Sequence, residues 1–148
     1  MNDEIEDLND TYPGAGTFKF GDSEKRCNRL ISLVREGKKT ANCDALSVFG
    51  DDEAALPQVG RCDIATTWDD VPALVLKTTG VKQIRFCDVT EDMALADGEN
   101  DSLAGWQQTH KAYFERNGGF DPEMILVFEH FELIENLAGR EIGPEGKK

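Results

Sequence analysis

One long segment near the middle of the chain, residues 72–86, constrains the fold more than any other. It reads PALVLKTTGVKQIRF and is rich in the β-branched residues that favour strands. Gly80 interrupts it, and a glycine inside a strand is typical of a bulge that bends the strand. The segment therefore predicts a long bent strand of the kind that helps to close a small β-barrel.

An amphipathic helix is predicted ahead of this strand. Apolar residues recur there at the i, i+3, i+4 and i+7 spacing of one buried helix face: Cys27, Leu30, Ile31 and Val34. Asp22 or Ser23 is expected to cap the start of the helix, because both side chains can accept a hydrogen bond from its first turn. Gly37 is expected to end it, as a glycine in the left-handed conformation.

The remaining segments indicate short strands at 17–20, 39–46 and 61–68, a short helix at 88–98, a longer helix at 101–119 and a terminal strand at 123–135. The longer helix has an apolar stripe of Leu103, Trp106, His110, Tyr113 and Phe114, which predicts core packing for Trp106 and His110.

Neither a repeat nor a linker divides the sequence. We therefore expect one α+β domain. It should span residues 12–137, between an acidic flexible tail (1–11) and a flexible C-terminal tail (138–148).

The net charge of −13 argues against tight, nonspecific binding to a nucleic-acid backbone. The charge is uneven, however, because seven basic residues fall between positions 19 and 39: Lys19, Lys25, Arg26, Arg29, Arg35, Lys38 and Lys39. Either a local basic face on an acidic body or a mixed, solvated helix surface accounts for this pattern.

Three features that are missing from the sequence, namely a long apolar run, a signal peptide and a C-x-x-C pair, indicate where the protein is located and whether it needs a cofactor. No apolar run approaches the roughly 20 residues that span a bilayer, and the acidic N-terminus does not resemble a signal peptide, so we expect a cytoplasmic protein without membrane contact. The four cysteines form no C-x-x-C pair and there are only two histidines. We therefore expect reduced, mostly buried thiols and neither a metal nor another cofactor.

Four segments together resemble the ASCH (activating signal cointegrator homology) family: YPGAGTFKFGDSEKRCNRLISLVREGKKTA, LPQVGRCDI, GENDSLAGWQQTHKAYFERNGGF and ILVFEHFELIE. The most specific element follows the first helix and comprises Gly37, Lys39 and Asn42. The resemblance implies a PUA-like fold, a small bent β-barrel flanked by about three helices with a cleft between them. Such domains are associated with RNA and modified bases. Some family members resemble N4-acetylcytidine amidohydrolases, and others have been linked to ribonuclease activity.

In the amidohydrolase branch, the resemblance implies a catalytic lysine, a threonine nucleophile three residues later and a glutamate from the later acidic segment. Lys39 matches the lysine and Glu99 is the candidate glutamate, with Asp97 and Asp101 as alternatives. A nearby carboxylate would keep Lys39 charged, so that it serves as an anion or oxyanion contact. The alternative for Lys39 is a surface lysine at a helix end.

The nucleophile position departs from the family pattern, because Asn42 stands where the threonine is expected. An amide has no hydroxyl with which to form an ester intermediate. Thr40 shares a strand face with Asn42 and is the candidate substitute, and Tyr113 offers a second hydroxyl. Asn42 could instead hydrogen-bond the edge of a base, or simply belong to the bonding of its strand.

Four further residues complete the candidate ligand-binding set. Lys38 would contribute to a basic corner, Asp63 would face the cleft, and Trp68 would stack on a base. Ser102 would bring a helix N-terminus to a phosphate. Three of the four also have a structural explanation: a solvated lysine for Lys38, an edge-strand acid for Asp63 and an N-cap for Ser102.

Three functions are left open by the sequence. The first is a module that recognises RNA or a modified nucleoside or nucleotide in a cleft around Lys39. The second is a metal-independent hydrolase of RNA or of an acylated nucleoside, which is ribonuclease-like or N4-acetylcytidine amidohydrolase-like. The third is a non-catalytic domain that binds a partner protein, which the acidic charge would suit.

Overall fold

The computed structural model describes residues 11–50 and 52–137. Within them, five strands and three α-helices make an α+β domain. The strands are β1 (Thr17–Lys19), β2 (Ala41–Ala45), β3 (Cys62–Thr66), β4 (Pro72–Arg85) and β5 (Ile125–Asn136). The helices are α2 (Glu24–Arg35), α3 (Glu91–Asp97) and α4 (Leu103–Arg116). Three short 3₁₀ helices are η1 (Leu46–Phe49), η2 (Glu53–Ala55) and η3 (Phe86–Asp88).

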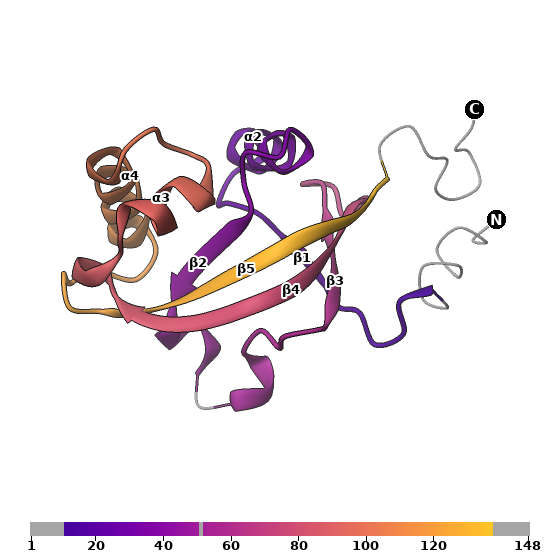
Figure 1. Cartoon of the computed structure of the whole chain (residues 1–148), viewed down its shortest axis with the longest axis horizontal. Coiled ribbons are helices and arrows are strands. Elements are labelled where there is room, and N and C mark those ends of the chain that lie inside the picture. Colours follow the sequence, from indigo (N-terminus) through magenta and orange to yellow (C-terminus); the bar gives the residue numbers. More distant parts are fainter. Residues whose placement is uncertain (1–10, 51, 138–148) are drawn as a thin grey trace.

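The strands form one sheet in the order β1-β3-β4-β5-β2, which leaves β1 and β2 at its edges. The β1–β3 pair is parallel and the other pairs are antiparallel. The pairing of β4 with β5 shifts register between Thr78 and Gly80 and again between Val75 and Leu76. These irregularities bend the two long strands, as the sequence predicted for Gly80. Figure 1 shows β4 and β5 running side by side along the molecule.

Each half of the bent strands supports a separate core. One core joins α2 to the first half of β4, and its members include Leu30, Leu74 and Phe131. A second core joins α3 and α4 to β2 and the first half of β5, through Trp106 and Phe128 among others. Figure 1 shows α3 and α4 together at one end of the long strands, apart from α2. The bend thus lets a single sheet pack against helices at two places.

Local sequence signals account for the helix boundaries. The Ser23 hydroxyl accepts a hydrogen bond from the Arg26 N–H (3.2 Å) and caps α2. The Ser102 hydroxyl accepts from the Gly105 N–H (3.0 Å) and caps α4. All four residues of the predicted apolar stripe of α2 are buried. With three α-helices beside one mixed sheet in the described residues, the predicted α+β class is confirmed.

The structure bears on two further expectations, the flexible tails and the absence of a membrane span. The acidic tail, apart from Thr11, and the whole C-terminal tail lie outside the described residues. Within the described part of the chain, no helix is both long and apolar enough to cross a membrane.

Candidate functional site

A cleft separates the two edge strands of the sheet and continues toward α4. Its larger chamber, about 300 Å³, lies between β1 and β2. Its smaller chamber, about 70 Å³, lies between α2, β2 and α4. The two chambers share Lys19, Asn42 and Asp44 as lining residues, so we treat them as one cleft. It opens where the bent sheet leaves its two edge strands unpaired with each other.

The larger chamber combines apolar and polar surfaces. Phe18, Phe49 and Pro57 contribute apolar side chains, while Asn42 and Asp44 contribute hydrogen-bonding groups. A concave site with apolar walls and a few convergent polar groups is typical of small-molecule sites. Its volume lies at the lower end of the range for such sites, which fits a ligand about the size of a nucleobase or nucleoside.

Asn42 and Asp44 lie on the same face of β2, because side chains alternate along a strand. Asn42 lines both chambers, and its amide has no hydrogen-bond partner among residues 11–50 and 52–137. One carboxylate oxygen of Asp44 accepts a bond from the Ala45 N–H (2.9 Å). Partial burial raises the pKa of Asp44 above its ordinary value. Both side chains thus retain bonding capacity toward the cleft.

In the smaller chamber, Arg26 is already engaged by protein groups. Its guanidinium donates to both carboxylate oxygens of Glu99, at 3.0 and 2.9 Å. The same guanidinium lies 4.9 Å from the centre of the Tyr113 ring. Burial raises the pKa of the Tyr113 hydroxyl, so that group is neutral at physiological pH. The chamber is therefore polar, but its principal cation is paired.

The structure buries Lys39 instead of presenting it to the cleft. Lys39 is 1% exposed and lines neither chamber. Its ammonium donates to the Asp97 carboxylate (2.6 Å), the Ala41 carbonyl (2.8 Å) and the Asp97 carbonyl (3.2 Å). Asp97, which the sequence left as an alternative to Glu99, is therefore its ionic partner. A side chain so enclosed cannot contact a ligand in the cleft without rearrangement.

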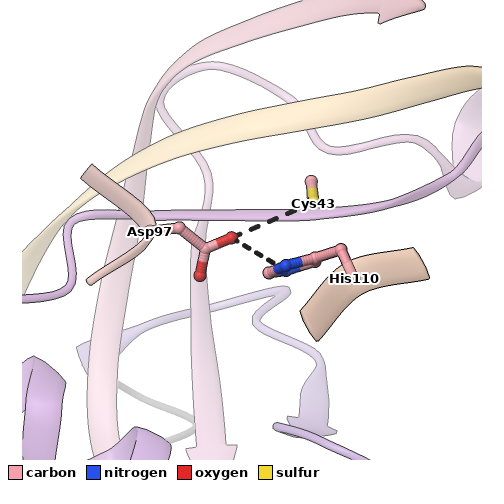
Figure 2. A group of neighbouring side chains, drawn as sticks. All are labelled: Cys43, Asp97 and His110. Atoms are coloured by element: carbon pink, nitrogen blue, oxygen red, sulfur yellow. Dashed lines mark hydrogen bonds and ion pairs between the residues drawn. The ribbon is translucent and has the colours of Figure 1, made fainter. Parts of the chain in front are cut away.

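Asp97 is the centre of a buried polar network. Its second carboxylate oxygen accepts from Trp106 Nε1 (3.1 Å) and lies 3.2 Å from His110 Nε2. Burial would raise the pKa of Asp97, but the Lys39 charge and the bonds from His110 and Lys39 outweigh burial and lower it. Figure 2 shows Asp97 directed toward both Cys43 and His110, which come from β2 and α4. The network ties these elements to the end of α3.

Cys43, Asp97 and His110 also place potential metal-ligand atoms within 4.8 Å of one another. The hydrogen bonds of Asp97 and the protonation of Cys43 do not fit a metal centre. Asp97 already accepts from an ammonium and an indole N–H. Burial, followed by the Asp97 charge, raises the pKa of the Cys43 thiol well above its ordinary value, which opposes the thiolate that a metal requires. The three residues are better described as part of the hydrogen-bonded core.

The predicted catalytic residues do not converge on one chamber. Tyr113 lines the smaller chamber, whereas Lys39 is buried with Asp97 and Glu99 is paired with Arg26. Thr40 is exposed, lines neither chamber, and its hydroxyl lies 3.5 Å from the Ala96 carbonyl. The fold thus places no hydroxyl on β2 beside Asn42.

The predicted ligand-binding residues divide in a similar way. Asn42 and Asp63 line the larger chamber, where Asp63 accepts from Gly16 N–H (2.9 Å) and Arg61 Nε (3.0 Å). Lys38 is exposed beside Glu36, and Trp68 lies partly exposed in the turn between β3 and β4. Ser102 caps α4 and lines neither chamber.

Sequence reasoning missed several residues that line the cleft. Asp44 could have been found, because it follows Asn42 by two positions on the same strand face. Phe49 comes from η1, seven residues after Asn42, and Glu129 comes from β5, far away in the sequence. Arg26 was noted only as a positive charge, although it lies at the cleft and binds Glu99. No local pattern could have joined Glu129 and Arg26 to Asn42, because they lie on β5 and α2.

The bent five-stranded sheet, the three helices and the cleft define a PUA-like α+β domain. The ASCH domain pattern matches residues 16–135, and the chain belongs to the ASCH domain family. No curated protein matches the chain.

Solved structures agree with this assignment. The ASCH domain from Lactobacillus crispatus JV V101 is 31% identical, with a TM-score of 0.76 over 86% of this chain and 84% of that one. Protein EF3133 from Enterococcus faecalis V583 is 28% identical, with a TM-score of 0.80 over 97% and 93% of the two chains. The hypothetical protein PH0355, at 14% identity and a TM-score of 0.54 over 81% and 97%, supports the fold alone.

Proposed function

We propose that this ASCH domain recognises RNA or a modified nucleoside or nucleotide by taking a base into the cleft between β1 and β2. One observation carries the proposal: the amide of Asn42 faces a chamber of about 300 Å³ with both apolar and polar walls, and has no hydrogen-bond partner among the described residues. An amide both donates and accepts, so it can bond to the edge of a base. Membership of the ASCH family adds support through the association of its PUA-like fold with RNA.

The walls of the chamber suit the faces of a base. Phe49 belongs to η1, which follows β2, and Phe18 belongs to β1, so the two aromatic residues come from the two edges that border the cleft. The Phe18 ring also makes an edge contact with Phe20. An aromatic side chain that stacks on a base contributes about 1–3 kcal/mol without regard to sequence. Stacking on these rings would supply affinity, while Asn42 and Asp44 would supply the hydrogen bonds.

Binding is better supported than hydrolysis, whether ribonuclease-like or amidohydrolase-like. A covalent mechanism needs a hydroxyl or thiol nucleophile beside an accessible activating group. Asn42 occupies the expected nucleophile position, Thr40 lies outside the cleft, and Lys39 is enclosed by Asp97. We therefore expect no Lys39-dependent product from N4-acetylcytidine or single-stranded RNA.

Calorimetric titration of the full chain with the four ribonucleoside monophosphates and a short single-stranded RNA tests the proposal. Asn42→Ala should weaken binding about fivefold to tenfold, as expected for the loss of one or two hydrogen bonds. Lys38→Ala is the matched control, because Lys38 is an exposed neighbour that lines neither chamber. Absence of binding to every nucleotide and RNA, or a larger loss with Lys38→Ala than with Asn42→Ala, would contradict it and leave partner-protein binding as the alternative.

A further inference from the structure

We infer that the cleft selects guanine over the other bases, through Asn42 and Asp44 acting as a pair. The inference rests on the proposed function, since it names the base that the same chamber would take. It begins with the position of the two residues on β2, where they are separated by one residue and share a face. Their Cα atoms are therefore about 6.5 Å apart. Both side chains line the two chambers of the cleft.

The bonding groups of this pair match one base edge. A carboxylate accepts only, and an amide NH₂ donates. Guanine presents a carbonyl oxygen followed by two adjacent N–H donors along its Watson–Crick edge. The Asn42 amide can donate to the carbonyl, while the Asp44 carboxylate accepts from both N–H groups. Such two-bond contacts give carboxylates and planar donors their specificity.

The other bases leave the carboxylate poorly matched. Adenine and cytosine each place a ring-nitrogen acceptor beside their amino group, and that acceptor would face an oxygen of Asp44. Uracil offers one N–H, flanked by two carbonyl oxygens. In each of these cases an oxygen of Asp44 meets a lone pair or is left unpaired, which is costly in a partly enclosed site. Inosine, which lacks only the guanine amino group, would lose one of the two bonds.

The surroundings of the pair favour a donor-rich ligand. Glu129 lies opposite Asn42 in the β2–β5 register and lines the same chamber. Burial raises the pKa of Glu129, which accepts a hydrogen bond from the Thr78 hydroxyl. Asp63 adds a further carboxylate. Among the described residues, three carboxyl groups, those of Asp44, Asp63 and Glu129, thus line the chamber beside the Asn42 amide.

The cations that line the cleft all have carboxylate partners. Lys19 pairs with Asp70, Arg61 with Asp63 at 3.0 Å, and Arg26 with Glu99 at 2.9 Å. A phosphate would have to compete with those partners for the same donors. We therefore expect the base edge to determine selectivity, with little contribution from the phosphate.

Calorimetric titration with guanosine, inosine, adenosine, cytidine and uridine monophosphates distinguishes the outcomes. The guanine nucleotide should bind about tenfold or more tightly than the adenine, cytosine and uracil nucleotides, with the inosine nucleotide in between. Asp44→Asn should lower affinity for the guanine nucleotide at least about tenfold and leave the weak ligands nearly unchanged, because it keeps the shape of the side chain and removes an acceptor. Lys38→Ala should preserve the whole order.

Each contrary result has a separate meaning. Comparable affinity for all five nucleotides, or a preference that survives Asp44→Asn, would overturn guanine selection while leaving nucleotide binding in place. Failure of every nucleotide and RNA to bind would overturn the proposed function and this inference together. Thermal unfolding of each variant establishes that the protein is folded before its affinity is compared.

Discussion

Lys39 shows how burial changes the role of a residue that the sequence placed beside a cleft. Its ammonium is satisfied by the side chain and carbonyl of Asp97 and by the Ala41 carbonyl. A buried ion pair contributes little beyond a hydrophobic equivalent, yet removal of one partner leaves an uncompensated charge. We therefore assign Lys39 a structural role, in which it holds the end of α3 against the start of β2.

Lys39→Met should lower the free energy of unfolding by about 3–5 kcal/mol, because the Asp97 carboxylate would remain buried without its cation. Denaturant titration followed by circular dichroism measures this difference. Lys38→Ala should change stability by less than about 0.5 kcal/mol, since Lys38 is an exposed residue. Equal stabilities of the two variants would show that the Lys39–Asp97 pair does not support the fold.

In contrast to Lys39, the ionised Asp44 side chain lowers the stability of the fold, because it is partly buried. Burial raises its pKa in the folded state, because the charged form is less well solvated there than in the unfolded chain. Its contribution to stability is full below the unfolded pKa of about 3.9 and is lost as the pH rises through the folded pKa. Asp44→Asn should therefore gain stability relative to the native chain as the pH rises through that window.

Denaturant titrations of both proteins at several values between about pH 3 and pH 7 measure this change. A stability difference that is constant across the range, or one that moves against Asp44→Asn as the pH rises, would contradict the assignment. A stability gain combined with loss of ligand binding is the signature expected of a residue retained for function.

At the scale of elements, the connection between α3 and α4 contains Gly98, on which the buried contact between Lys39 and Asp97 depends. Gly98 ends α3 with φ +83°. A Cβ atom at this position would lie 2.5 Å from the Lys38 carbonyl oxygen. Only glycine therefore lets the backbone after Asp97 approach the backbone before Lys39, and this approach brings the two charges together.

Gly98→Ala should destabilise the protein by several kcal/mol more than Gly37→Ala. Both glycines have φ near +80°, so the conformational cost of a Cβ, about 1–2 kcal/mol, is shared. Gly37 has nothing within 4 Å of that position, whereas Gly98 meets backbone atoms. Thermal unfolding of the two variants isolates the contact, and indistinguishable midpoints would show that the close approach is not required.

Local pattern predicted much of the element structure. The β-branched run with Gly80 predicted the long bent strand, and Ser23 and Ser102 predicted helix starts. The choice of carboxylate for Lys39 was not predictable, because Asp97, Glu99 and Asp101 are close together in the sequence. Only the packing of α3 against β2 brings Asp97 to the ammonium and turns Glu99 toward Arg26.

At the scale of the whole molecule, the net charge of −13 limits how RNA can bind. The cations that line the cleft already have carboxylate partners, so few would release counterions from a nucleic-acid backbone. The proposed recognition of a base in a partly enclosed chamber, with little contact to neighbouring phosphates, is consistent with this charge distribution.

Affinity for RNA should therefore depend weakly on length and on salt. We expect the logarithm of the binding constant to fall by no more than about one unit for each tenfold rise in salt, as for about one phosphate contact. Fluorescence anisotropy with labelled oligonucleotides of increasing length tests this expectation. A fall of three units or more, or affinity that rises steeply with length, would indicate an extended backbone track instead.

The central claim is that the cleft between β1 and β2 holds the base. Two-dimensional ¹H–¹⁵N NMR of the labelled full chain, titrated with guanosine monophosphate, tests that claim most directly. We predict that the largest shift changes fall on Phe18, Asn42, Asp44 and Phe49. Changes confined to the separate, more open pocket of about 400 Å³ beside α4, which Phe86, Lys111 and Phe120 line, would contradict it.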